Sequence, residues 1–251
     1  MKNIILIFIM FLGLYCHAGF GAGEELNFSI SYGIITAGSV NMLVEKGVNQ
    51  DSIPIFKVTS KAKTTSFFDR LYKVRDLIEI EFAQTDFQTY RYHKKLREGS
   101  YRQNRINLYY PNLGYANYLR KDKKAKEWSD KKYDIPVPSH DIFTTFFKVR
   151  IQEFAVGDTI QATVTEDAKT TSVNILIKRI KKIKTIFGDV DCYELEPQLR
   201  GTDSIFKQSG DIFIYLTADD DKIPVLLESE VIFGSFRATL KGYKPAEITQ
   251  P

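Results

Sequence analysis

"FFDRLYKVRDLIEIEF", residues 67–82, ends in a strict alternation of apolar and charged side chains. Isoleucine or phenylalanine occupies every even position from 78 to 82, and glutamate occupies the odd positions between them. A period of two predicts a β-strand with one buried face and one exposed face. Arg75 and Asp76 stand at the entrance of this strand. We expect them to form a structural pair that ties a corner of the fold, and not a binding site.

Outward from this strand, turn signals such as "EGS" (98–100) and "FGD" (187–189) separate further extended segments. Short connections predict antiparallel hairpins, and their regular spacing predicts an all-β fold, a large antiparallel barrel-like or sandwich domain. The candidate strands lie near residues 26–34, 38–46, 53–65, 71–83, 86–97, 101–110, 114–121, 159–166, 171–184, 190–199, 210–217, 223–233 and 235–243.

One short amphipathic helix is predicted in "PSHDIFTTFFKVRIQEF", residues 138–154. Ser139 is the candidate N-cap, and Asp141 falls in the first turn. The apolar stripe of this helix is wide, so it has to be buried. We expect the helix to cover one end of the sheet, with a membrane-surface helix as the alternative.

The first 21 residues resemble a secretory signal, with Lys2 ahead of an apolar run from Ile4 to Leu14. This run is too short to span a bilayer, which takes about 20 residues. We expect cleavage after Ala18 or Gly21, export to the periplasm, and a single all-β domain over 22–251. A lipid anchor on Cys16 is not expected, because bulky Tyr15 precedes it.

Charge is unevenly distributed along the chain. Residues 91–132 hold 13 Lys and Arg against 4 Asp and Glu, whereas residues 189–230 hold 3 against 11. The basic stretch is rich in tyrosine and superficially resembles a nucleic-acid surface, but export argues against nucleic acid as a partner. Anionic lipid headgroups, lipopolysaccharide or acidic glycans suit it better. The alternative is a solvated strand face. The candidate ligand rim consists of Tyr90, Arg91, Tyr92, Lys95 and Arg97.

Residues for catalysis or metal binding are sparse. Two histidines and Cys192 remain after the signal, too few for a typical zinc site, and Cys192 is expected in the core. "DDD" at 219–221 lacks the glycine and distal glutamate of a calcium loop. No nucleophile elbow is present. We therefore expect no catalytic residue, cofactor or metal, although a hydrolase with paired carboxylates stays a minor alternative.

The run "DIFIYL" (211–216) is apolar on both faces. Such a strand is either sandwiched between layers or lines an apolar lumen. Together with the basic segment, it supports a non-enzymatic periplasmic protein that binds an amphiphilic or anionic envelope component. The alternative is an envelope assembly or scaffold protein that contacts partners through strand edges or charged faces.

Several segments, in this order, resemble a bacterial family named domain of unknown function 3108, exported proteins of Gram-negative envelopes. The resemblance implies an antiparallel, barrel-type β architecture in the periplasm, and it brings no activity and no catalytic residues. The basic segment at 119–134 is richer in lysine than the family pattern. The matching segments are "GEELNFSISYGIITAG", "RLYKVRDLIE", "LREGSYRQNR", "HDIFTTFFKVR", "GDTI", "FGDVDCYELEP" and "LTADDDKIPVLLESEVIFGSFRATLKGY".

Overall fold

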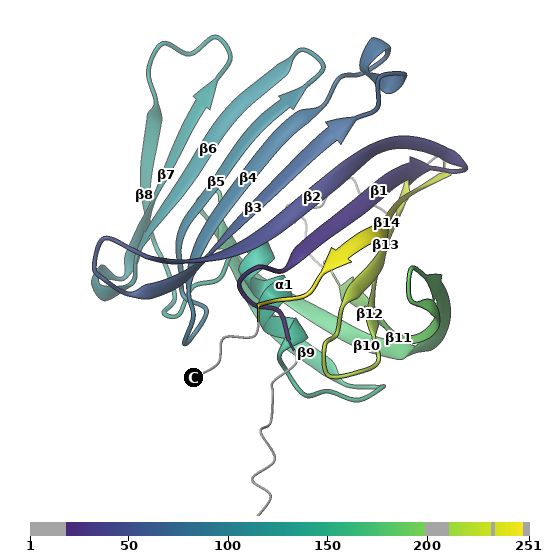
Figure 1. Ribbon diagram of the computed structural model, residues 1–251. Helices are drawn as coiled ribbons and strands as arrows, with labels where there is room; N and C mark the ends of the chain where they lie inside the picture. The colour runs from purple at the N-terminus through teal and green to yellow at the C-terminus, as the bar shows by residue number, and fades with distance from the viewer. Residues whose placement is uncertain (1–18, 199–210, 232–233, 248–251) are drawn as a thin grey trace, which may run out of the picture.

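The computed structural model describes residues 19–198, 211–231 and 234–247 (Figure 1). The predicted signal peptide therefore lies almost wholly outside the described residues. The strands are β1 (Glu25–Tyr32), β2 (Ile35–Val48), β3 (Pro54–Thr64), β4 (Arg75–Ala83), β5 (Thr89–Glu98), β6 (Tyr101–Tyr110), β7 (Tyr115–Asp122), β8 (Ser129–Asp134), β9 (Thr159–Glu166), β10 (Lys169–Thr185), β11 (Gly188–Gln198), β12 (Ile212–Thr217), β13 (Pro224–Val231) and β14 (Gly234–Lys244). The helices are the short 3₁₀ segments η1 (Phe68–Arg70) and η2 (Pro111–Leu113), and the α-helix α1 (Ile142–Arg150).

Within the described residues, all fourteen strands form one antiparallel sheet in the order β8-β7-β6-β5-β4-β3-β2-β1-β14-β13-β12-β11-β10-β9. Neighbours in the sheet are neighbours in sequence, except where β1 pairs with β14, as at Phe28 and Leu240. The sheet twists and curls into an incomplete barrel (Figure 1). This confirms the all-β, barrel-like fold predicted from strand spacing.

Helix α1 lies at one end of the curled sheet (Figure 1). Its N-cap is Asp141, whose carboxylate accepts the backbone N–H groups of Phe143 and Thr144 at 2.8 and 3.1 Å. The prediction of Ser139 as N-cap was wrong. Ser139 lies two residues too early, and its own N–H donates to the Gln88 side chain instead.

The core fills the helix end of the barrel. Phe147 of α1 is fully buried and packs against Phe82 of β4, with ring centroids 5.9 Å apart. Close by, the buried Arg150 guanidinium binds the Glu24 carboxylate through two hydrogen bonds of 2.8 and 2.9 Å. Because both ions are buried, removing one of them would leave an uncompensated charge inside the protein. Apolar packing and the Arg150–Glu24 ion pair therefore hold α1 in place, where it closes this end of the barrel.

Strand β8 was not predicted, because its sequence, "SDKKYD", has no apolar alternation. It pairs with β7 at the edge of the sheet. Charged side chains suit an edge strand, since they discourage pairing with other chains. Here the pairing partner, and not the composition, determines the strand.

Side chains connect β9 and the turn after it, at one end of the sheet, to β5 and β6 near the other end. The closing turn, residues 166–168 between β9 and β10, reaches the inner face of β5 and β6. Its Asp167 binds Lys94 at 3.0 Å and Arg105 at 2.5 Å. In addition, the Tyr109 hydroxyl donates to the Thr165 carbonyl at 2.5 Å. The barrel is thus closed by ion pairs and hydrogen bonds across the gap. Among the described residues, no helix is long and apolar enough to cross a membrane.

Candidate functional site

An apolar pocket of about 460 Å³ lies at the end of the barrel away from α1. It lies between β1, β2, β3, β14 and the η1 segment, and its wall is almost wholly apolar. Cavities of this size hold a small ligand or part of a larger one. The lining residues are Ile30, Tyr32, Ala37, Gly38, Ser39, Ala62, Lys63, Thr64, Phe68, Tyr72, Val74 and Phe236.

The pocket continues the core along the same face of the sheet. On β1, Leu26 and Phe28 are buried in the core, and the next two residues of the same parity, Ile30 and Tyr32, line the pocket. Side chains two residues apart share a face of a strand, so core and pocket form one apolar surface. The same change occurs along β14, where Leu240 is buried in the core and Phe236 lines the pocket. The helix end of this surface is filled, and the other end is open.

Small residues make room for the cavity. Gly38 of β2 lies so close to β3 that a Cβ there would stand 2.4 Å from the Lys63 carbonyl oxygen. Next to it, Ala37 has no direct partner on β1, where the pairing slips between Ile30 and Ser31. A bulge of this kind bends the strand locally. Glycine and alanine therefore permit a close strand contact and leave space above it.

The η1 segment forms the outer wall of the pocket with Phe68 and Tyr72. An ion pair holds this wall: the Arg75 guanidinium donates to both carboxylate oxygens of Asp69, at 2.9 and 2.5 Å. The Thr64 hydroxyl donates to the same carboxylate at 2.6 Å. These hydrogen bonds, that of Arg75 first, keep the pKa of Asp69 below its usual value. The wall is consequently tied to the start of β4.

Arg75 and Asp76 do stand at the start of β4, but the structure gives them separate partners. Arg75 binds Asp69, as described above. The Asp76 carboxylate accepts the backbone N–H of Arg97 at 2.7 Å. Both residues thus contact protein groups, and Arg75 also fixes the wall of the pocket.

The candidate rim residues are all on β5, yet none of them lines the pocket. Tyr92 is buried in the core at 2% exposure. Arg91, Lys95 and Arg97 alternate with Tyr92 and therefore belong to the opposite, outer face of β5. Tyr90 falls where the pairing between β4 and β5 slips, and the Arg91 guanidinium contacts His93 and Glu79.

Polar groups gather on the inner face around the closing turn. Burial raises the pKa of Glu166 to about 7, against the opposing effect of Lys94. Burial would also raise the pKa of Asp167, but Lys94 and Arg105 outweigh it and hold that pKa below its usual value. These adjacent carboxyl groups are engaged with cations that close the barrel, and neither lines the apolar pocket.

The two-sided apolar strand "DIFIYL" is sandwiched and does not line the pocket. Phe213 and Tyr215 of β12 belong to the core cluster around Phe82, while Ile214 and Leu216 pack in the second cluster beneath α1. The residues that do line the pocket were missed. One signal was available, because the even positions of "ELNFSISY" (25–32) carry four apolar side chains in succession. The contributions of η1 and β14 follow from tertiary structure alone.

A family model described as a protein of unknown function, DUF3108, matches residues 27–241. The chain belongs to the DUF3108 family. This match confirms the resemblance found in the sequence, and it covers every residue that lines the pocket.

A solved structure of a barrel-like protein has a fold similar to that of the DUF3108 chain. A beta-barrel-like protein of domain of unknown function DUF1849 from Brucella abortus has a TM-score of 0.56 at 9% identity, covering 92% of this chain and 100% of that one. At such low identity the likeness shows the fold alone. A putative lipoprotein from Parabacteroides distasonis has a TM-score of 0.31 at 9% identity, covering 91% of this chain and 98% of that chain. No curated protein matches the DUF3108 chain.

Proposed function

We propose that this protein is a non-enzymatic periplasmic carrier that binds the apolar part of an envelope amphiphile, such as the acyl chain of a lipid, in the pocket of β1, β2, β3, β14 and η1. The single observation that carries this proposal is the apolar cavity of about 460 Å³, which continues the core at the open end of the barrel. An apolar wall favours an apolar occupant because water inside it lacks hydrogen-bond partners.

The chemistry of the lining supports binding over catalysis. Aromatic and aliphatic side chains dominate the wall, and among the residues that the structure describes no carboxylate takes part in it. Two acids beside the η1 wall, Asp69 and Asp76, already bind Arg75 and the Arg97 backbone. A polar headgroup would then lie outside the cavity, at the solvent-facing mouth.

A pocket-filling substitution tests the proposal. Ala62 lines the pocket, and tryptophan in its place would occupy part of the cavity. Each methylene group displaced from the wall costs about 0.8 kcal/mol, so excluding two of them weakens binding about tenfold. Ala155→Trp, at an exposed position beyond α1, is the matched control.

Two measurements apply to both variants and to the wild type. Native mass spectrometry after purification from the periplasm, followed by lipid extraction, identifies a retained ligand. Titration of the delipidated proteins with cis-parinaric acid measures affinity by fluorescence. We expect lipid retention and probe binding in the wild type and in Ala155→Trp, and a loss of both in Ala62→Trp at unchanged melting temperature. Equal binding by all three proteins, or no binding by any, would refute the proposal.

A further inference from the structure

Large apolar side chains are exposed at the open end of the barrel, immediately beside the pocket. Four of them, here called the mouth residues, are Ile34 (102% exposed), Leu71 (72%), Phe67 (63%) and Ile35 (52%). Removing such side chains from water is favourable, so their grouping at one end indicates a contact surface.

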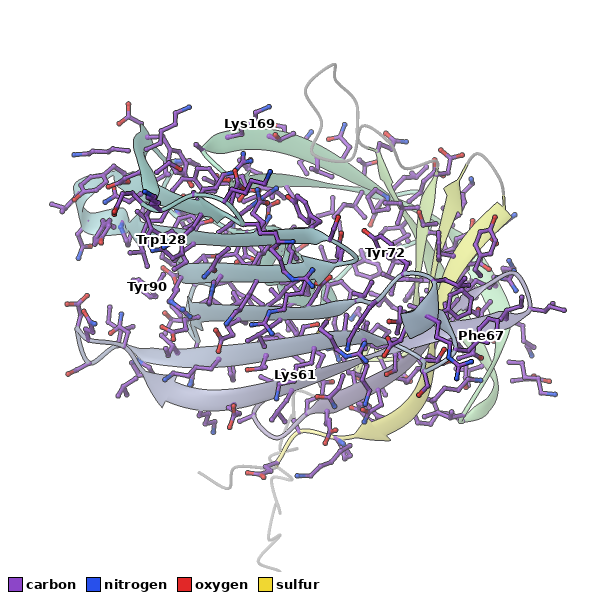
Figure 2. The ribbon with its side chains drawn as sticks, turned by 90° about the horizontal axis from the view of Figure 1, so that it is seen from above. Lys61, Phe67, Tyr72, Tyr90, Trp128 and Lys169 are labelled. Atoms are coloured by element: carbon purple, nitrogen blue, oxygen red, sulfur yellow. The ribbon has the colours of Figure 1, made fainter. Side chains whose placement is uncertain are left out.

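The mouth residues come from two loops that border the cavity. Ile34 and Ile35 follow Tyr32, which lines the pocket and whose ring lies 5.0 Å from that of Phe236. In the other loop, Phe67 and Leu71 are the sequence neighbours of the lining residues Phe68 and Tyr72. Figure 2 looks onto the molecule from above, with Phe67 and Tyr72 labelled. The exposed apolar surface is thus continuous with the pocket wall.

Cations flank this surface. Lys63, Arg70, Lys73 and Arg97 are exposed, and among the described residues none of their side chains has an ion-pair partner. The hydrogen bond from Gly99 N–H to the Lys73 carbonyl, at 2.8 Å, places the β5–β6 turn beside the η1 loop. The acid within that loop is already neutralised by its ion pair with the first residue of β4. Two further acids, Asp76 and Glu98, lie beside these cations, and the lysines and arginines outnumber the acids. The mouth therefore combines exposed apolar side chains with an excess of positive charge.

We infer that the mouth docks onto an anionic lipid bilayer, with the four mouth residues entering the interface and the surrounding lysines and arginines contacting the headgroups. Apolar side chains backed by lysine and arginine are the pattern that binds anionic membrane surfaces. Charge complementarity selects the bilayer over an uncharged partner. The inference rests on exposure and charge at the mouth, and it holds whether or not the pocket is occupied. Docking in this orientation would bring the pocket against the lipid.

Flotation of delipidated protein with vesicles tests the inference. The vesicles consist of phosphatidylcholine alone, or of equal parts of phosphatidylcholine and phosphatidylglycerol. We expect binding to the anionic vesicles, little binding to the neutral ones, and weakening by salt. No binding to anionic vesicles, or equal binding to both kinds, would overturn the inference.

Matched variants locate the contact. Ile34→Ser precedes β2 and should weaken vesicle binding about tenfold by removing one buried apolar side chain. Val48→Ser, at the far end of the same strand, is its control: Val48 is 64% exposed, and a strand of 14 residues spans about 45 Å. Equal losses in both variants would contradict docking by the mouth.

Charge variants follow the same design. The double variant Arg70→Gln, Lys73→Gln should weaken binding about thirtyfold, at about 1 kcal/mol for each cation near the surface. Lys57→Gln, exposed near the opposite end of β3, should leave binding unchanged. Equal effects of the double variant and Lys57→Gln would contradict the inference.

The variant Ala62→Trp separates docking from ligand binding. It should bind vesicles like the wild type, because its mouth is intact. A loss of vesicle binding in this variant would show that the pocket, and not the mouth, carries the contact, and would overturn the inference. Retained docking together with lost cis-parinaric acid binding would support both proposals separately.

Discussion

The carboxyl group of Glu166 lies inside the protein with part of its hydrogen-bonding capacity unused. One oxygen lies 3.4 Å from the Lys94 ammonium, and the other has no hydrogen-bond partner among the described residues. Burial raises its pKa from 4.5 to about 7. The folded protein therefore favours the protonated form of this group, and ionisation destabilises the fold.

The sign of the pH dependence follows from this shift. Below the unfolded pKa of 4.5 Glu166 is neutral in both states. Between pH 4.5 and about 7 the unfolded state ionises while the folded state stays protonated, so stability falls progressively, and the full penalty is reached above about pH 7. Raising the pKa from 4.5 to about 7 corresponds to about 3 kcal/mol of unfolding free energy. Glu166→Gln stays neutral, so its stability relative to the wild type should improve by about 3 kcal/mol between about pH 4 and pH 8. Urea unfolding across this range measures the difference, which isolates Glu166 from the other titrating groups. Parallel stability curves for the two proteins would contradict the prediction.

Alternation in the sequence predicted faces of single strands well. Phe82 and Ile80 are buried, as the pattern "DLIEIEF" indicates, and Glu79 lies on the other face with His93. The same pattern could not identify the partner of Arg75. That partner, Asp69, comes from a loop whose path depends on η1 packing over the pocket.

At the scale of elements, the start of α1 depends on one carboxylate. Asp141 accepts two backbone N–H groups of the helix, and its other oxygen accepts the Thr89 hydroxyl of β5 at 2.9 Å. Asp141→Ala removes the cap and leaves a buried hydroxyl with fewer partners, so it should lower the unfolding free energy by about 2 kcal/mol. Asp141→Asn keeps an acceptor oxygen and should cost less.

Thermal unfolding and amide hydrogen exchange in α1 check this prediction. Asp130→Ala, at an exposed position of β8, serves as the control. Equal stability of Asp141→Ala and Asp130→Ala would show that the helix does not depend on its cap.

Elements with strong local signals were predicted from the sequence, and those defined by partners were not. The hairpin strands and the helix have periodic apolar residues and turn signals, and all of them are present. Strand β8 has neither signal, because an edge strand of charged residues gains its order from pairing with β7. The role of the closing turn could likewise not be predicted from its own sequence, because the cations that bind Asp167 lie on β5 and β6.

At the scale of the whole molecule, the packing of Phe20 distinguishes between the two predicted signal-peptide cleavage sites. Its ring packs against Phe147 of the helix, with ring centroids 4.5 Å apart, and against Phe56 at 5.3 Å. Of the two cleavage positions considered, the one after Ala18 keeps this phenylalanine in the mature protein. We predict that the exported protein begins at Gly19.

N-terminal sequencing and intact mass of the exported protein check this prediction. A chain that starts at Ala22 should be less stable than one that starts at Gly19 by about 1 to 2 kcal/mol, because the Phe20 ring is partly buried against the core. A mature protein beginning at Ala22 with undiminished stability would contradict it.

The pocket is also a property of the whole molecule. Its wall draws on both ends of the chain, from Ile30 on β1 to Phe236 on β14. Sequence patterns report which face of a strand is apolar, but not which part of that face the helix leaves uncovered. For that reason the barrel-like fold could be predicted, whereas the site could not.

The pairing of β1 with β14 determines when the pocket can form in a newly synthesised chain. A ribosome and an export channel release a polypeptide from its N-terminus onward, so β1 appears early and its partner is among the last segments to arrive. Until then, the edge of β1 that later pairs with β14 is open, and the pocket lacks the wall to which Phe236 belongs. Chains cut short before β14 would have no complete pocket. Among the described strands, β14 is thus the one whose synthesis completes the pocket.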